Sequence, residues 1–257
     1  MSLRLENYKF DPNIQPEQLE PIISINNTTI ATLGNVLTIS GRSGVRKSTF
    51  LHAFIGSYLS NKPLFNLKIN NPEQENKNKI LLLDTEQSEF SLYNQLRRLK
   101  KAANLTTINN NKLIIYRLRT FDSEEIKKSI IELLEIYKKE IFLLCIDNIL
   151  DMVLDYNNIS ETKSLMDFFK QITEHYNIVL FCVIHQSKST AFSIGHVGSR
   201  LEALAQTSLR VQYGELSKDV PDKNISELVV GEKIRDSEDF ESIRIHFNKS
   251  LGSYKQI

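Results

Sequence analysis

The chain has 257 residues, of which 41% are hydrophobic and 25% are charged, a balance typical of a globular protein. Its length suits one large α/β domain or two small ones. The formal net charge is +1, so the overall charge gives no general attraction to nucleic acid. Any nucleic-acid-binding surface therefore has to be local.

Nothing in the sequence predicts secretion or a membrane span. Cys145 and Cys182 each lie inside an apolar, strand-like run, and we interpret them as core residues in a reducing compartment. The segment Met1–Glu6 lacks the apolar stretch of a signal peptide. The apolar runs at 141–146 and 178–184 are far too short to cross a bilayer. We therefore expect a cytoplasmic protein without membrane contact.

Strand and helix patterns alternate over most of the chain. Residues 1–30 are polar with scattered prolines and are expected to form an N-terminal arm, followed by a single domain over 31–257. Apolar, β-branched runs predict strands at 35–40, 79–84, 113–118, 141–147 and 178–184. Helical spacing of apolar residues predicts helices at about 47–60, 88–103, 123–138 and 161–176. This alternation predicts a mainly parallel sheet flanked by helices.

The pattern changes in the last quarter of the chain. Strands are predicted at 208–213, 226–232 and 241–247 with no helix between them, which indicates an antiparallel C-terminal extension of the sheet. Residues 214–225 are expected to form a mobile turn. Residues 61–78, rich in Asn and Lys and containing two prolines, are expected to form a surface loop.

The segment after the strand at 35–40 matches a phosphate-binding P-loop except at one position. In the pattern G-x-x-x-x-G-K-[ST], Gly41, Lys47 and Ser48 occupy the first, seventh and eighth positions. The N-terminus of the helix that follows exposes unpaired N–H groups and attracts phosphate. Lys47 is expected to reach the β- and γ-phosphates of ATP, and the Ser48 hydroxyl to bind Mg²⁺. The candidate nucleotide-binding residues are Gly41, Arg42, Ser43, Gly44, Val45, Arg46, Lys47, Ser48 and Thr49.

Arg46 occupies the sixth position, where the pattern has glycine. Glycine is used where the backbone approaches a ligand closely or adopts a positive φ. A long side chain here could crowd the phosphates, point outward or add a second cation. We expect it to turn away from, or flank, the phosphates while the backbone keeps the shape of the loop. A chance match and a degenerate fold that no longer hydrolyses nucleotide are the alternatives.

Two further predicted strands end in acidic residues. Asp84 and Glu86 follow the strand at 79–84, and ligands bind at the carboxyl ends of parallel strands. Glu86 is therefore placed to polarise a water for attack on the γ-phosphate, although these acids could instead cap the next helix. The apolar run at 141–146 precedes Asp147, which is the Walker B form, in which the acid holds Mg²⁺ through water.

Together these motifs resemble the RecA-like P-loop NTPases, in particular the ATPase core of the replicative helicases of the DnaB and plasmid RepA kind. The resemblance covers most of residues 30–257 and implies a RecA-like fold. It implies that Glu86 is the water-activating glutamate and Asp147 the Walker B acid. The segment Ile184–Lys188 is similar to the family's sensor motif, whose glutamine, here Gln186, detects the γ-phosphate.

The resemblance also implies that copies of the chain assemble, as in the hexameric rings of this family. The segment Glu232–Asp236 looks like the family's K-x-R finger. In that motif two cations, here Lys233 and Arg235, reach the nucleotide of a neighbouring subunit and stabilise charge in phosphoryl transfer. The alternative is a pair of solvated cations among neighbouring acids.

In such rings, DNA passes the loops that follow the Walker B and sensor strands, here about 151–160 and 187–197. The second loop carries Lys188 and Phe192, and Arg200 follows it. These side chains are candidates for contacts with phosphates and bases of single-stranded DNA. The first loop is acidic and Asn-rich, which argues against strong binding there.

We therefore expect an ATP- and Mg²⁺-dependent ATPase, a helicase or DNA-remodelling motor in replication or in mobilisation of a genetic element. The alternative, favoured by Arg46, is a nucleotide-binding regulatory or scaffold protein with weak or no turnover.

Overall fold

The computed structural model of the chain describes residues 9, 11–15, 19–72, 76–186, 193–217, 220–248 and 252–257. Its first half contains β1 (Pro21–Ile25), β2 (Thr28–Thr32), β3 (Val36–Gly41), α2 (Lys47–Ser60), β4 (Leu67–Ile69), β5 (Lys79–Asp84), α3 (Glu89–Ala102), β6 (Leu113–Arg117) and α4 (Ser123–Tyr137). Its second half contains β7 (Ile141–Asp147), η1 (Ile149–Met152), α5 (Ile159–Tyr176), β8 (Val179–His185), α6 (Gly195–Leu204), β9 (Thr207–Ser217), β10 (Val220–Ile234), β11 (Ile243–Asn248) and β12 (Ser253–Gln256).

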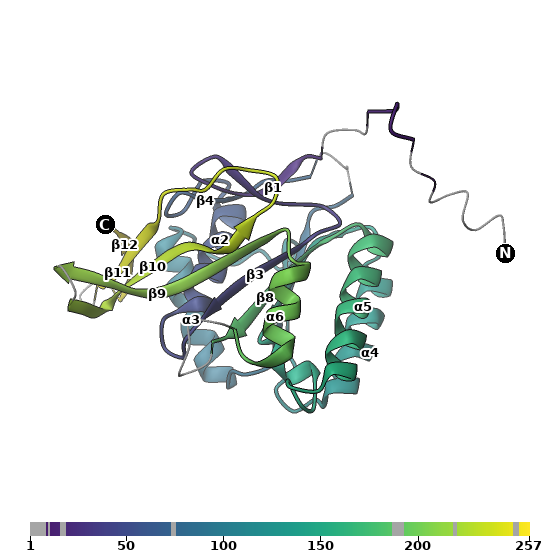
Figure 1. The fold of residues 1–257 in the computed structure, drawn as a ribbon. Coiled ribbons are helices and arrows are strands. Elements are labelled where there is room, and N and C mark those ends of the chain that lie inside the picture. The colour runs from purple at the N-terminus through teal and green to yellow at the C-terminus, as the bar shows by residue number, and fades with distance from the viewer. Residues whose placement is uncertain are drawn as a thin grey trace.

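Within the described residues, nine strands form one sheet in the order β12-β11-β10-β9-β3-β8-β7-β5-β6 (Figure 1). The pairs from β9 through β3 to β6 are parallel. The pairs that join β9, β10, β11 and β12 are antiparallel. The predicted fold class, a mainly parallel sheet flanked by helices with an antiparallel C-terminal extension, is confirmed.

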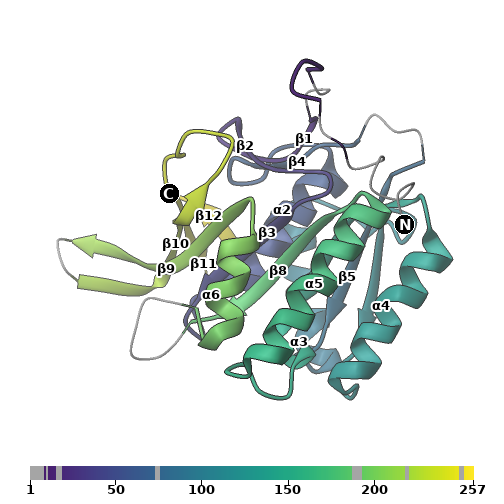
Figure 2. The same cartoon turned by 45° about the vertical axis from the view of Figure 1, so that its right-hand side comes forward.

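Helices cover both faces of the sheet. In Figure 2, α4, α5 and α6 lie in front of the sheet, with α2 and α3 behind it. The α2 face is closed by large fully buried side chains, among them Phe50 and Phe54. The other face packs around Leu165 and Phe169 of α5, which are four residues apart and so share one side of that helix. In the described part of the chain, no helix combines the length and apolarity that crossing a membrane requires.

The central strands are apolar along their whole length because helices cover both of their faces. Every residue of β7 is buried, as are the first six of the seven residues of β8. Such strands show no alternation of polar and apolar residues. Function is therefore carried by the residues at their ends, where the chain leaves the apolar layers.

The N-terminal arm predicted over residues 1–30 extends too far along the chain, because regular secondary structure begins at Pro21. Residues Pro21–Ile25 and Thr28–Thr32 are antiparallel strands, and they form a small sheet with β4 in the order β2-β1-β4. Ile22 and Ile23 are fully buried in the core that contains α2. The surface loop expected at 61–78 is likewise interrupted by β4. These strands have three to five residues, so the local sequence pattern that marks them is weak.

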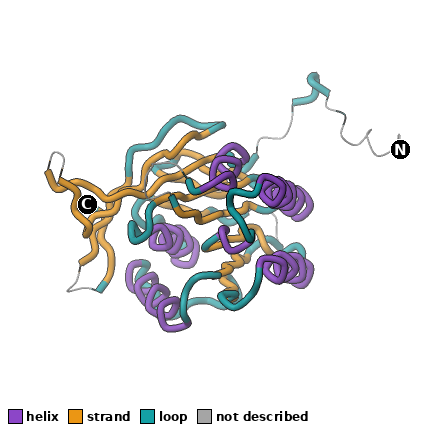
Figure 3. The backbone as a smooth tube through the Cα atoms, turned by 60° about the horizontal axis from the view of Figure 1, so that its bottom comes forward, coloured by secondary structure: helices purple, strands orange, loops and turns teal. Residues whose placement is uncertain are grey.

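The mobile turn expected at 214–225 is also wrong. The strand β9 extends to Ser217 and β10 begins at Val220, and Glu215 pairs with Pro221 and Gly214 with Asp222. The two strands form a hairpin that reaches away from the body of the protein (labelled in Figure 2), where Figure 3 shows strands projecting beyond the helices. Gly, Pro and Asn in this segment suggested a turn, but cross-strand pairing overrides that local preference.

Candidate nucleotide-binding site

The ends of four parallel strands meet at one edge of the sheet. The P-loop follows β3, Glu86 follows β5, Asp147 ends β7 and His185 ends β8. Gly41 lies opposite His185 in the β3–β8 pair, and Asp84 lies opposite Asp147 in the β5–β7 pair. Ligands bind at this edge in open α/β sheets.

The P-loop backbone has the course that its glycine pattern requires. A side chain at Gly41 would place its Cβ 2.6 Å from the Val211 carbonyl oxygen, so only glycine fits there. Gly44 has φ +85°, and Arg46 has φ 74° and ψ 39°, which is left-handed. Arg46 thus adopts the conformation that glycine would adopt, at a cost of ~1–2 kcal/mol.

The Arg46 side chain points toward the C-terminal strands. Its guanidinium donates a hydrogen bond to the Ser226 hydroxyl of β10 at 2.9 Å and lies 6.0 Å from the centroid of the Tyr254 ring of β12. These contacts agree with the expectation that the side chain turns away from, or flanks, the phosphates while the backbone keeps the shape of the loop. Arg46 occupies the N-cap position of α2 and its side chain makes no capping hydrogen bond. The first N–H groups of α2 therefore remain available for an anion.

Lys47 folds back onto the loop. Its ammonium group donates to the Gly41 carbonyl at 2.9 Å and to the Arg42 carbonyl at 3.1 Å. It also lies 3.1 Å from Nδ1 of His185. Burial lowers the pKa of Lys47 to about 8, although the charges of Asp147 and Glu86 oppose that shift. A buried ammonium beside a helix N-terminus that has no side-chain cap fits a phosphate ligand.

Ser48 and Asp147 provide oxygen ligands suited to Mg²⁺. The Ser48 hydroxyl is close enough to the Asp147 carboxyl group to favour its charged form. Asp147 is only 4% exposed. Burial raises its pKa to about 6, against the lowering effect of Ser48. A buried carboxylate next to a hydroxyl fits a hard cation, which would compensate for the lost hydration of the carboxylate.

Glu86 does not cap the following helix. Asp84 accepts the N–H groups of Glu86 at 3.2 Å and Gln87 at 2.7 Å, and Ser88 caps α3. The Glu86 carboxylate instead lies 3.4 Å from Nε2 of His185. The hydrogen bond with His185 is the main cause that lowers the pKa of Glu86. The capping alternative for Glu86 is therefore wrong.

Gln186 lies beside the start of the P-loop. Its backbone N–H donates to the Gly41 carbonyl at 3.0 Å, and its side-chain amide donates to the Ser40 hydroxyl at 3.4 Å. His185, which precedes it, was not singled out from the sequence. The only available signal was its place at the end of the strand that pairs with β3. A cleft of ≈ 590 Å³ opens here, lined by Arg42, Ser43, Leu150, His185, Gln186 and Ile194.

No protein-family model matches this sequence, and no curated protein matches it. Among solved structures, the chain is similar to the KaiC-like protein PH0186 from the hyperthermophilic archaeon Pyrococcus horikoshii OT3. The TM-score is 0.58 at 12% sequence identity, and the match covers 88% of this chain and 90% of that chain. The fold is RecA-like. At this identity the similarity establishes the fold alone.

Lys233 and Arg235 lie away from the P-loop of their own chain. Both donate to the Ala203 carbonyl near the end of α6, at 2.7 and 2.6 Å. Ser226, which contacts Arg46, is seven positions from Lys233 along β10. Their partners on β9, Tyr213 and Ser208, are only five positions apart because β10 bulges between Val230 and Lys233, so at ~3.3 Å per residue the separation is about 17 Å. In their own chain both cations are thus engaged at the end of α6 rather than at the P-loop.

Of the three candidate nucleic-acid residues, the structure describes one. Arg200 is exposed on α6. Lys188 and Phe192 lie outside the described residues.

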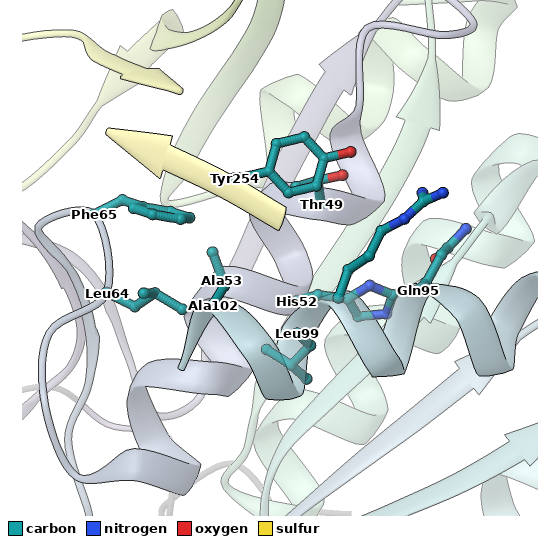
Figure 4. A pocket seen from close by; sticks show the side chains of 10 residues that line it. Thr49, His52, Ala53, Leu64, Phe65, Gln95, Leu99, Ala102 and Tyr254 are labelled. Atoms are coloured by element: carbon teal, nitrogen blue, oxygen red, sulfur yellow. The ribbon is translucent and has the colours of Figure 1, made fainter. Parts of the chain in front are cut away.

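A small hollow lies between α2, α3 and β12, close to the P-loop (Figure 4). Thr49, His52, Gln95 and Tyr254 line it, and its volume is ≈ 20 Å³. That volume is enough for about one water molecule and far too small for a nucleobase. The buried side-chain oxygen of Gln95 has no hydrogen-bond partner among the described residues. A single bridging water is the ligand that fits this hollow.

Proposed function

We propose that this chain binds ATP with Mg²⁺ and hydrolyses the γ-phosphate. The observation that carries the proposal is the convergence of Lys47, Glu86 and Asp147 at the sheet edge where Gly41 faces His185. A chance P-loop match would not bring a buried lysine, a buried metal-binding acid and a partly exposed carboxylate to one place.

Each of these residues has a distinct role. Lys47 exchanges one of its present partners for a phosphate oxygen, at little cost because its ammonium is already largely desolvated. Glu86 carries a lowered pKa and so is ionised near neutral pH, as the base that polarises a water must be. Gln186 lies where it can contact the γ-phosphate. Ser48 and Asp147 would hold Mg²⁺, which when bound neutralises charge on the phosphates.

Binding tests the proposal without requiring turnover. Lys47→Ala should weaken ATP binding by at least about tenfold, measured by calorimetry with Mg²⁺ present, because the variant loses its charge-assisted phosphate contacts. Lys127→Ala is the matched control, since Lys127 lies on α4 and pairs with Glu124. Equal affinity of the wild type and Lys47→Ala would refute the P-loop assignment.

The finer proposal is a motor that acts on single-stranded DNA as a homo-oligomer, with Lys233 and Arg235 serving the nucleotide of a neighbouring copy. Two observations support it. Both cations donate to the Ala203 carbonyl at the end of α6, and Lys233 is about 17 Å along the sheet from Ser226, the β10 residue that contacts Arg46. A hollow of ≈ 670 Å³ between α5 and α6 gathers basic side chains, namely Lys163, Lys170, His196, Arg200 and Arg235.

Two assays separate these finer features. Single-stranded DNA should accelerate ATP hydrolysis if the chain is a DNA motor. Arg235→Ala should lower turnover, and mixing it with Lys47→Ala subunits should restore part of the activity, because each variant supplies what the other lacks. An active protein that is strictly monomeric would refute the role of the neighbouring copy.

The alternative function is nucleotide-dependent regulation without turnover. The arginine at position 46 of the P-loop favoured this alternative. The hydrogen bond between the Arg46 side chain and Ser226 weakens that argument. Tight ATP binding with no phosphate release, with or without DNA, would favour this alternative over hydrolysis.

A further inference from the structure

We propose that His185 is a positioning residue that links Lys47 to Glu86, so that phosphate binding at Lys47 changes how Glu86 is held. This inference rests on the proposed function, because it concerns the same site. It assigns a role to a side chain that lies between the phosphate-binding lysine and the water-activating acid.

The sheet fixes the position of His185. It lies opposite Gly41 in the parallel β3–β8 pair, at the point where the P-loop begins. Its carbonyl accepts the N–H of Ile194, and the N–H of the next residue, Gln186, is bonded to Gly41. Main-chain bonds on both sides of His185 thus leave only its ring free to turn.

The neighbours of the ring determine its tautomer. An ammonium group can only donate, so the 3.1 Å contact with Lys47 requires Nδ1 of His185 to accept. Nε2 then carries the hydrogen and points it at the Glu86 carboxylate, 3.4 Å away. That distance exceeds the usual 2.7–3.2 Å range for such bonds, so the contact can still tighten. One imidazole ring therefore contacts both functional groups.

Phosphate binding must disturb this chain of contacts. The ammonium of Lys47 has three hydrogens, and its three partners are the Gly41 carbonyl, the Arg42 carbonyl and His185. A phosphate oxygen can be bound only if one of these partners is released. Loss of the contact with His185 frees the ring to move toward Glu86. The acid is then oriented by His185 when nucleotide occupies the loop, and held loosely when the loop is empty.

Isosteric substitutions separate the two contacts. His185→Asn keeps an acceptor near the position of Nδ1 and so retains the contact with Lys47. His185→Gln keeps a donor near the position of Nε2 and so retains the contact with Glu86. His185→Ala removes both. Each variant is compared with the wild type for ATP affinity by calorimetry and for kcat and KM by phosphate release.

The expected results form a crossed pattern. His185→Ala and His185→Gln should bind ATP about three- to tenfold more tightly than the wild type, because Lys47 no longer has to release a ring acceptor, whereas His185→Asn should not. His185→Ala and His185→Asn should lose about tenfold or more in kcat, and His185→Gln should recover most of it. A residue that only supports the fold would shift all three variants alike.

Two failures are distinguishable. Equal ATP affinity in His185→Asn, His185→Gln and His185→Ala would overturn the link between His185 and Lys47. Equal loss of kcat in all three would overturn its link to Glu86. Absence of phosphate release by the wild type would refute the proposed hydrolysis, while the affinity series would still decide the contact with Lys47.

Discussion

Replacing Arg46 by glycine restores the common P-loop pattern, and we expect this change to destabilise the protein rather than improve its site. The residue holds a left-handed backbone conformation that glycine adopts without strain. Its side chain, however, donates to the Ser226 hydroxyl, and Ser226 is fully buried. The variant therefore relieves strain in the loop and loses a contact between the loop and β10.

Three contributions determine whether Arg46→Gly raises or lowers the free energy of unfolding. Relief of the left-handed strain contributes ~1–2 kcal/mol in favour of glycine. Loss of the charged hydrogen bond to a buried hydroxyl costs ~1.5–3 kcal/mol. The added freedom of glycine in the unfolded chain costs ~0.4–1 kcal/mol. We expect Arg46→Gly to lower the free energy of unfolding by about 1–2 kcal/mol. Arg46→Ala should lower it further, because alanine keeps the strain.

Urea denaturation of wild type, Arg46→Gly and Arg46→Ala measures these differences, and ATP titration of the same proteins measures the site. Because the guanidinium points toward Ser226, ATP affinity should change by less than about tenfold, or ~1.4 kcal/mol. Arg97→Ala is a control, since Arg97 is exposed on α3 and lies outside the P-loop. A more stable Arg46→Gly protein, or an affinity gain well above tenfold, would refute the reasoning and mean that Arg46 obstructs the phosphates.

Two further predictions concern stability. Lys77 is 6% exposed and its ammonium donates to the Tyr176 and Asn177 carbonyls at the end of α5. Lys77→Met should lower the free energy of unfolding by about 2 kcal/mol in urea, because these carbonyls lose their donor; no loss would contradict this capping role. Burial lowers the pKa of His52 to about 4 from its usual 6.5, so the folded chain excludes a proton that the unfolded chain takes up as the pH falls. Stability should therefore decline between pH 6.5 and 4, by up to about 3 kcal/mol, and His52→Gln should remove that decline while His196→Gln, at an exposed position, should not.

The sequence predicted the parts of the fold whose signals are local and long. The helices near 47–60, 88–103, 123–138 and 161–176 and the buried parallel strands agree with the structure within a few residues. Runs such as Ile141–Ile146 are short, continuous and apolar and fit a strand buried on both faces, which is what the structure shows. Their order along the chain then determines the parallel sheet and places Asp147 at its functional edge.

The features that were missed depend on partners distant in the chain. The Arg46 side chain is held by Ser226, 180 positions away. His185 faces Lys47 through strand register, across 138 positions. The strands β1, β2 and β4 are short and stabilised by one another. Local patterns carry no information about such pairings. The P-loop could therefore be predicted from the sequence, whereas the contacts that surround it could not.

The most direct measurement of the proposed chemistry compares the wild type with Glu86→Gln in a steady-state phosphate-release assay with ATP and Mg²⁺. Glu89→Gln, three residues further on in the first turn of α3, is the matched control. We expect Glu86→Gln to bind ATP normally and to lose about a hundredfold or more in turnover, because the base that polarises the water is gone. Turnover by Glu86→Gln equal to that of the wild type would contradict hydrolysis at this site.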